Sequence, residues 1–197
     1  MPDGVEQEGQ QINIKKDSVI GLATGSTPVG MYKCLTEMNK AGEITFKDVT
    51  SYNLDEYYPL APDHDQSYRY FMNHNLFDNI DIDKANTNVP DGLAEDPAAM
   101  GKAYDEAIKA AGGIDLQVLG LGPNGHIAFN EPEDELYVGT HLTGLTDSTI
   151  EANSRFFASK ADVPTQAVTM GIGSIMQAKK IIVLASGKGK HDVIVKM

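Results

Sequence analysis

A short apolar run that ends in a glycine-rich turn is the feature that most limits what this chain can fold into. Residues 114–119 have the composition of a buried strand, and three glycines follow, with His126 at the end of the turn and Glu131 five residues later. Glycine lets the backbone turn sharply and approach a ligand closely. In open α/β sheets, ligands bind beyond the carboxyl ends of the strands. The stretch therefore predicts either a catalytic loop or a structural turn, the commoner role of such glycines.

Strand and helix patterns alternate along the rest of the chain. Apolar runs predict strands at 18–23, 49–54, 114–119 and 180–185, separated by predicted helices at 28–40, 67–77 and 97–111. In the last of these helices the apolar residues recur at three- and four-residue spacing. This alternation favours an α/β fold with a doubly wound, mostly parallel sheet and helices on both faces, a Rossmann-like three-layer architecture. We found no repeat or linker, so residues 1–197 are predicted to form a single domain.

Composition and charge exclude several classes of partner. The formal net charge of −12 argues against nucleic acid and anionic membranes, and it requires local donors for any bound phosphate. No apolar run approaches the length of a bilayer span, and residues 1–11 do not resemble a secretory signal. The single cysteine, Cys34, lies in a predicted helix, where a structural thiol is expected and no internal disulfide can form. We therefore expect a cytoplasmic protein.

Polar residues at the first predicted strand end form a candidate phosphate cradle. Gly25, Ser26 and Thr27 stand just before a predicted helix. Backbone N–H groups, two hydroxyls and a helix N-terminus together bind anions well. The alternative is that Ser26 or Thr27 is only a helix cap. The turn is not a P-loop, because the required lysine is missing.

Titratable residues at the other strand ends are candidates for acid–base chemistry. Asp55 follows the second strand beside Glu56 and is either a general base or a turn residue. His126 is a candidate acid or base that Glu131 orients, or else a satisfied histidine near a surface glutamate. Asn124 is a polar neighbour that also suits positive φ in a tight turn.

Two basic residues complete the candidate site. Arg155 offers a bidentate fork and Lys188 a point charge to a phosphate, although a solvated surface cation is the commoner role of either residue type. No stretch has the full ligand spacing of a calcium loop, so we expect no metal site.

Four stretches together resemble glucosamine-6-phosphate deaminases. They are residues 22–28 (Leu-Ala-Thr-Gly-Ser-Thr-Pro), 53–57 (Asn-Leu-Asp-Glu-Tyr), 122–132 (Gly-Pro-Asn-Gly-His-Ile-Ala-Phe-Asn-Glu-Pro) and 153–157 (Asn-Ser-Arg-Phe-Phe). The segment Gly-His-Ile-Ala-Phe-Asn-Glu-Pro is close to diagnostic. The 6-phosphogluconolactonases share the fold but typically carry arginine after Asp-Glu, where this chain has Tyr57, and Gly-His-Thr-Ala-Ser-Leu-Phe-Pro at the later site.

The resemblance implies an enzyme of amino-sugar catabolism, a hydrolase/isomerase that converts glucosamine 6-phosphate to fructose 6-phosphate and ammonia. Asp55 matches the base that moves a proton between C2 and C1, and His126 matches the group that assists ring opening. Glu131 matches the partner of that histidine, and Asn124 stands where some members carry a relay aspartate. Such acid–base chemistry on a small sugar phosphate needs no cofactor. The predicted phosphate contacts are Gly25, Ser26, Thr27, Arg155 and Lys188.

The departures from the family pattern carry expectations of their own. His141 and Thr143 replace basic residues of the allosteric hexameric branch, so we predict no activator site. The resemblance runs from about Asp17, residues 1–16 are an atypical start, and the family's C-terminal strands are absent, so the fold is expected to be truncated at both ends. The alternatives are a 6-phosphogluconolactonase-like hydrolase and a non-catalytic sugar-phosphate-binding fragment. A monomer and a homo-oligomer are both compatible with the sequence.

Overall fold

A five-stranded parallel sheet forms the centre of the molecule. The structure is a computed structural model that describes residues 4–122, 124–132 and 134–196. The strands lie in the order β4-β2-β1-β5-β8, and every neighbouring pair is parallel. Their bounds are β1 (Val19–Leu22), β2 (Thr50–Asn53), β4 (Thr87–Asn88), β5 (Leu116–Gly120) and β8 (Ile181–Leu184). The predicted α/β class and the four predicted strands are confirmed.

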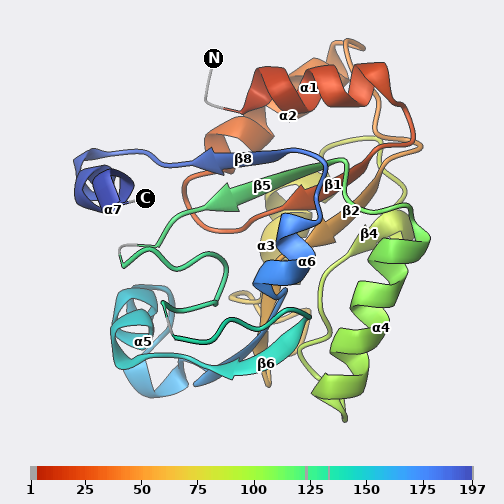
Figure 1. The fold of residues 1–197 in the computed structure, drawn as a ribbon. Helices are drawn as coiled ribbons and strands as arrows, with labels where there is room; N and C mark the ends of the chain where they lie inside the picture. The colour runs from red at the N-terminus through yellow and green to blue at the C-terminus, as the bar shows by residue number, and fades with distance from the viewer. Residues whose placement is uncertain (1–3, 123, 133, 197) are drawn as a thin grey trace.

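Helices cover both faces of this sheet. α1 (Val5–Ile14) and α2 (Val29–Lys40) lie together above it in Figure 1, and α4 (Pro97–Ala110) and α6 (Ile172–Met176) lie below. The apolar faces of two of the predicted helices are buried: Met31 and Leu35 of α2 and Tyr104 and Ile108 of α4 all enter the main core. Cys34 is half-buried and packs against the same core, as expected of a structural thiol. The sheet and the helical layer on each of its faces therefore form a three-layer architecture.

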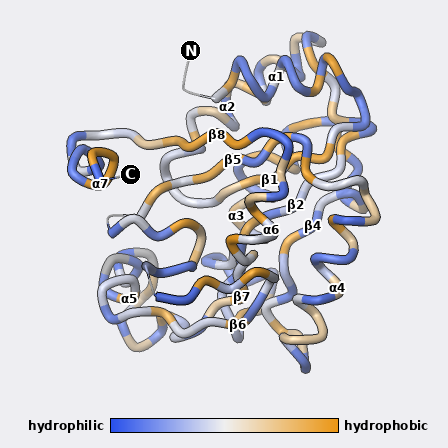
Figure 2. Tube along the Cα trace, in the orientation of Figure 1, coloured by the Kyte–Doolittle hydropathy of each residue, from blue (hydrophilic) through white to orange (hydrophobic). Residues whose placement is uncertain are grey.

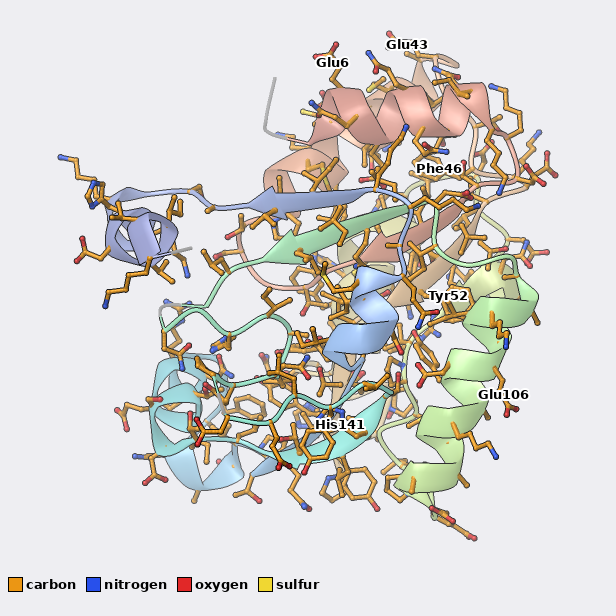
Figure 3. The ribbon with its side chains drawn as sticks, in the orientation of Figure 1. Glu6, Glu43, Phe46, Tyr52, Glu106 and His141 are labelled. Atoms are coloured by element: carbon orange, nitrogen blue, oxygen red, sulfur yellow. The ribbon has the colours of Figure 1, made fainter. Side chains whose placement is uncertain are left out.

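One contact shows how α4 is fixed to the sheet. Tyr52 of β2 meets the ring of Tyr104 edge-on, with centroids 5.5 Å apart, and lies between the sheet and α4 in Figure 3. The Tyr104 hydroxyl donates to the carbonyl of Asn53 at 2.8 Å. Buried tyrosines satisfy their hydroxyl in this way while their ring fills the core.

A second, antiparallel sheet was not predicted. Its strands lie in the order β3-β7-β6 and are β3 (Asp55–Tyr58), β7 (Gln166–Thr169) and β6 (His141–Gly144). Each is four residues long, and β3 and β6 are largely polar, so neither shows a clear apolar alternation. The helix α5 (Asp147–Asn153) and two 3₁₀ turns, η3 (Ser154–Phe156) and η4 (Lys160–Asp162), connect β6 to β7.

Helix α1 was also missed, because polar residues occupy its inner face. Its buried residues are Val5, Glu8, Gly9, Gln11 and Ile12. Their spacing is helical, but glutamate and glutamine at core positions hide the apolar stripe that identifies an amphipathic helix. Figure 2 shows blue and orange alternating along α1, whereas β8 is mostly orange. Glu6 points away from the sheet in Figure 3.

The predicted helix 67–77 changes type halfway. It begins as α3 (Tyr68–Met72), capped by the Ser67 hydroxyl, and continues as a π-helical turn η1 (Asn73–Phe77). The short 3₁₀ turn η2 (Lys84–Asn86) precedes β4. After β8, η5 (Lys188–Lys190) leads into α7 (His191–Lys196), the predicted helical start. In the part of the chain that the structure describes, we found no helix long and apolar enough to cross a bilayer.

Candidate active site

The strand order places a crevice between β1 and β5. After β1 the chain passes through α2 to β2, which lies on one side of β1 in the sheet. β5 lies on the other side of β1, and its further neighbour is β8. Such a switch point is where open α/β sheets bind ligands. A cavity of about 820 Å³ opens there, beyond the carboxyl ends of both strands. Of the residues singled out from the sequence, it is lined by Gly25, Ser26, Thr27, Asp55, Asn124, His126 and Arg155.

The predicted phosphate cradle lies at the start of α2. Gly25 has a φ of 93°, which turns the chain from β1 into the helix. Pro28 is the N-cap residue, and no side chain caps the helix. The alternative reading of Ser26 or Thr27 as a plain cap is therefore wrong. The first N–H groups of α2 have no partner within the helix, and the residues at this helix start line the cavity described above.

Asp55 stands where the chain leaves the parallel sheet. β2 ends at Asn53, and Asp55 lies neither in that strand nor in a turn: it is the first residue of β3 and pairs with Thr169. Its side chain lines the cavity although the residue is only 6% exposed. Burial, reinforced by the charge of Glu56, raises the pKa of Asp55 to about 8. A carboxylate with a raised pKa is a stronger base once it has ionised.

Glycines shape the turn that carries His126. A Cβ on Gly122 would lie 2.4 Å from atoms of the His126 ring, so only glycine leaves room for the imidazole. Gly125 has a φ of 95°, which L-residues rarely adopt. The positive φ that we considered for Asn124 is thus found at its neighbour, and again at Ala128, where φ is 55°.

The imidazole of His126 is neutral in this site. Burial lowers its pKa, Glu131 opposes that effect and Lys190 adds to it. Its Nδ1 lies 3.6 Å from Oε1 of Glu131, beyond direct hydrogen-bonding distance, and has no hydrogen-bond partner. A neutral imidazole can accept or donate a proton near neutral pH. Catalytic contacts are often loose without substrate and tighten in the complex.

Asn124 connects His126 to Glu131. Its Oδ1 accepts from the His126 backbone N–H at 3.2 Å, and its Nδ2 donates to Oε2 of Glu131 at 2.5 Å. An aspartate here would instead set a second negative charge against Glu131. Thr146 and Thr149 also donate to Glu131, at 3.3 and 3.1 Å, and tie it to α5. Glu131 therefore lies behind the cavity lining and contacts it through Asn124 and His126.

The basic residues fall differently from our prediction. Arg155 of η3 lines the cavity, but Lys188 is exposed and lies outside the lining. Lys190 lines the cavity instead, and its ammonium donates to the carbonyl of Leu121. Burial lowers the pKa of Lys190. The sequence offered both lysines in one Gly-Lys-Gly-Lys stretch, and nothing local distinguishes them.

An aromatic wall was not recognised from the sequence. Tyr57 lies 4.8 Å from Tyr68, 5.9 Å from Phe129 and 5.7 Å from Phe157 between ring centroids, and all four residues line the cavity. Asn130, next to Phe129, donates to the Met170 carbonyl at 2.8 Å and anchors the loop to the end of β7. Three of the resemblance motifs carry one of these rings, which was the available signal.

No metal centre emerges from the geometry. Among residues 4–122, 124–132 and 134–196, no group of three or more His, Cys, Asp or Glu side chains is arranged to hold a metal ion. The polar groups that line the cavity are instead an anion cradle, a buried carboxylate and an imidazole. This set suits proton transfer on an anionic small molecule.

Comparisons with known proteins agree with this geometry. Residues 5–197 match the family model described as glucosamine-6-phosphate isomerases/6-phosphogluconolactonase. The chain is 61% identical to the glucosamine-6-phosphate deaminase of Clostridium perfringens strain 13 over 96% of its own length and 78% of the relative's. It is 57% identical to the enzyme of that name from Thermoanaerobacter sp. strain X514, over 94% of this chain and 73% of the relative.

Two solved structures extend the comparison. A monomeric glucosamine-6-phosphate deaminase superposes with a TM-score of 0.94 at 39% identity, covering 98% of this chain and 80% of that one. The 6-phosphogluconolactonase of Thermotoga maritima gives a TM-score of 0.73 at 23% identity, covering 98% of this chain and 82% of that one. The second likeness shows the fold alone.

Proposed function

Because this chain belongs to the family of glucosamine-6-phosphate isomerases and 6-phosphogluconolactonases, we propose that it is a glucosamine-6-phosphate deaminase. It converts glucosamine 6-phosphate to fructose 6-phosphate and ammonia in amino-sugar catabolism. The observation that carries the proposal is a single cavity that holds Asp55, His126 and an uncapped helix N-terminus. Since the reaction is an isomerisation with loss of the amine, the label hydrolase is imprecise.

Asp55 is the proposed base that moves the proton between C2 and C1. With a pKa of about 8, its carboxyl is mostly protonated at neutral pH while the cavity is empty. The ammonium group of an amino sugar beside it would favour the ionised form. Substrate binding would therefore activate the base. Buried surroundings then keep the carboxylate weakly solvated and reactive.

His126 is the proposed group that assists ring opening. Its neutral imidazole has a free, buried Nδ1 and faces the cavity. When it takes up a proton, Glu131 at 3.6 Å favours the charged form. Asn124 holds both partners and itself needs no change of charge.

The phosphate is proposed to sit on the N-terminus of α2. The backbone amides there, with Ser26 and Thr27, supply neutral donors. Arg155 and Lys190 line the same cavity and supply positive charge in a chain whose net charge is −12. Such local donors are needed because the field of the whole molecule repels an anion.

The lactonase alternative has no specific support. It rests on solved structures at 23% identity or less, which share the fold. Tyr57 belongs to the aromatic wall at the position where that branch typically carries arginine. A reducing cytoplasm remains the location that we propose for an enzyme with one cysteine.

The decisive experiment is ammonia release from glucosamine 6-phosphate by the purified chain. Asp55→Asn keeps the size of the side chain but removes the proton acceptor, so we expect kcat to fall by roughly 10²-fold or more while substrate binding changes much less. Hydrolysis of 6-phosphogluconolactone is the counter-assay. Near-normal turnover by Asp55→Asn would exclude its role as the base. A chain that binds the sugar phosphate and releases no ammonia would be the non-catalytic module.

A further inference from the structure

Glu56 is not one of the residues that line the cavity and has no role in the proposed chemistry. We propose that it is a positioning residue, which fastens the segment carrying Asp55 to the start of α3 and thereby holds the base and the aromatic wall in register. The inference rests on the proposed function for its kinetic consequence, but the link itself is a property of the fold.

The Glu56 carboxylate is buried, and both of its oxygens accept hydrogen bonds. The residue is 1% exposed. Its Oε1 accepts from the backbone N–H of Tyr57 at 2.9 Å and of Tyr68 at 2.8 Å, and its Oε2 accepts from that of Arg69 at 2.9 Å. The next amide of α3, that of Tyr70, is bound by the Ser67 hydroxyl at 3.0 Å. One side chain from β3 thus satisfies the helix start, with the charge-assisted bonds that are the stronger kind.

This link joins three parts of the cavity. Asp55 precedes Glu56 directly, and Tyr57 follows it. Tyr68, which Glu56 binds through its amide, stacks on Phe129 with centroids 6.1 Å apart and parallel rings, and packs against Tyr57. A shift of Glu56 would therefore move the base and the wall together. Displacements of about 1 Å at a reacting group can cost roughly 10²-fold in rate.

Glu56 is closely packed against the segment around Gly92. A Cβ on Gly92 would lie 3.2 Å from Cγ of Glu56 and 2.5 Å from the carbonyl oxygen of Leu60. The Arg69 guanidinium donates to the hydroxyl and the carbonyl of Thr87, at 2.8 and 2.9 Å. The charge of Glu56 is held by backbone amides.

The charge of Glu56 also acts on Asp55. Burial is the larger cause of the raised pKa of Asp55, and the charge of Glu56 is the second. Burial likewise raises the pKa of Glu56 to about 7, against the amides of Tyr57, Tyr68 and Arg69 and the charge of Arg69, which lower it. Two adjacent carboxyls of this kind titrate as a pair. Removing one charge should lower the pH at which the other ionises.

The test uses Glu56→Gln, Glu56→Asp and the matched control Asp96→Asn. Asp96 is an exposed carboxylate that accepts the N–H groups of Ala98 and Ala99 at the start of α4, outside the cavity lining. The first readout is ¹³C NMR titration of the Asp55 carboxyl, assigned with Asp55→Asn. The second is kcat for ammonia release at equal folded fraction.

We expect Asp55 in Glu56→Gln to titrate about one pH unit lower, the scale on which such pairs interact. Its kcat should fall about 10-fold or more, because the amide nitrogen cannot accept the Arg69 N–H. Glu56→Asp should keep the titration near that of the wild type and still lose kcat, because the shorter chain cannot reach all three amides. Asp96→Asn should change melting temperature only.

An unchanged Asp55 titration in Glu56→Gln, or an unchanged kcat in both Glu56 variants, would overturn the proposal. If Glu56→Gln does not fold, Glu56→Asp decides: a lower kcat supports the link, and a wild-type kcat overturns it. If the wild-type chain releases no ammonia, the proposed function fails, and the Asp55 titration still tests the link by itself.

Discussion

Glu8 should make the free energy of unfolding depend on pH in a way that one substitution abolishes. Its side chain lies wholly inside, between α1 and the core, and neither carboxyl oxygen has a hydrogen-bond partner. Burial, and after it the charge of Glu8, raises the pKa of the Tyr32 phenol, whose hydroxyl donates to the Ala23 carbonyl. Burial raises the pKa of Glu8 from 4.5 to about 8. The folded protein therefore holds a proton that the unfolded chain releases.

The sign and the size follow from this difference. Below the unfolded pKa of 4.5 both states are protonated and Glu8 costs nothing through ionisation. As the pH rises toward about 8, the unfolded chain gains from ionising while the folded one does not, so stability is lost progressively. Each pH unit well inside that window corresponds to about 1.4 kcal/mol, so the loss between pH 5 and 7 is about 2–3 kcal/mol.

The assay compares Glu8→Gln with Glu6→Gln, its matched control on the exposed side of α1, where Glu6 accepts from Gln10. Urea unfolding at pH 5, 6 and 7 gives the free energy of each variant relative to the wild type. Glu8→Gln buries an amide at a cost that does not change with pH, so the advantage of this variant over the wild type should grow by about 2–3 kcal/mol from pH 5 to 7. The Glu6→Gln difference should stay flat. A flat difference for Glu8→Gln would refute the reasoning.

Three further results are expected. Arg155→Ala and Lys190→Ala should each weaken binding of an unreactive sugar phosphate by about 1.5–3 kcal/mol in calorimetry, and Lys188→Ala should do so less; a large loss only for Lys188→Ala would contradict the assignment. Burial acts to raise the pKa of Asp115, but bonds from two lysine ammonium groups and the Val19 amide outweigh it and lower that pKa, so Asp115→Asn should lose about 2 kcal/mol of stability at pH 7. That loss should shrink as the pH falls through the lowered pKa in acid titrations, and a loss that stayed constant would count against the pairing. Because β6 carries no basic pair, N-acetylglucosamine 6-phosphate should not activate, and rate curves should be hyperbolic; activator-dependent sigmoidal kinetics would disprove this.

The local patterns of the chain were enough for its central architecture. Strands such as β1 and β5 are continuous apolar runs because parallel strands are buried on both faces, and the helices between them carry regular apolar stripes. The loop around His126 could be predicted for a similar reason. Its glycines are required by a positive φ and by the space that the imidazole occupies, and both requirements arise within a few residues. The cradle at the start of α2 is equally local.

What only the tertiary structure decided depends on contacts between distant segments. Helix α1 and the sheet β3-β7-β6 form because partners elsewhere cover them, and their own sequences show no clear period. Lys190, not Lys188, reaches the cavity because the η5 turn directs the Lys190 side chain toward the carbonyl of Leu121. The hydrogen bonds of Glu56 form only when the fold brings the first amides of α3 next to β3. Side-chain chemistry is set by the sequence, but burial and partnership, which raise the pKa of Asp55 and orient its neighbours, exist only once separated segments have packed together.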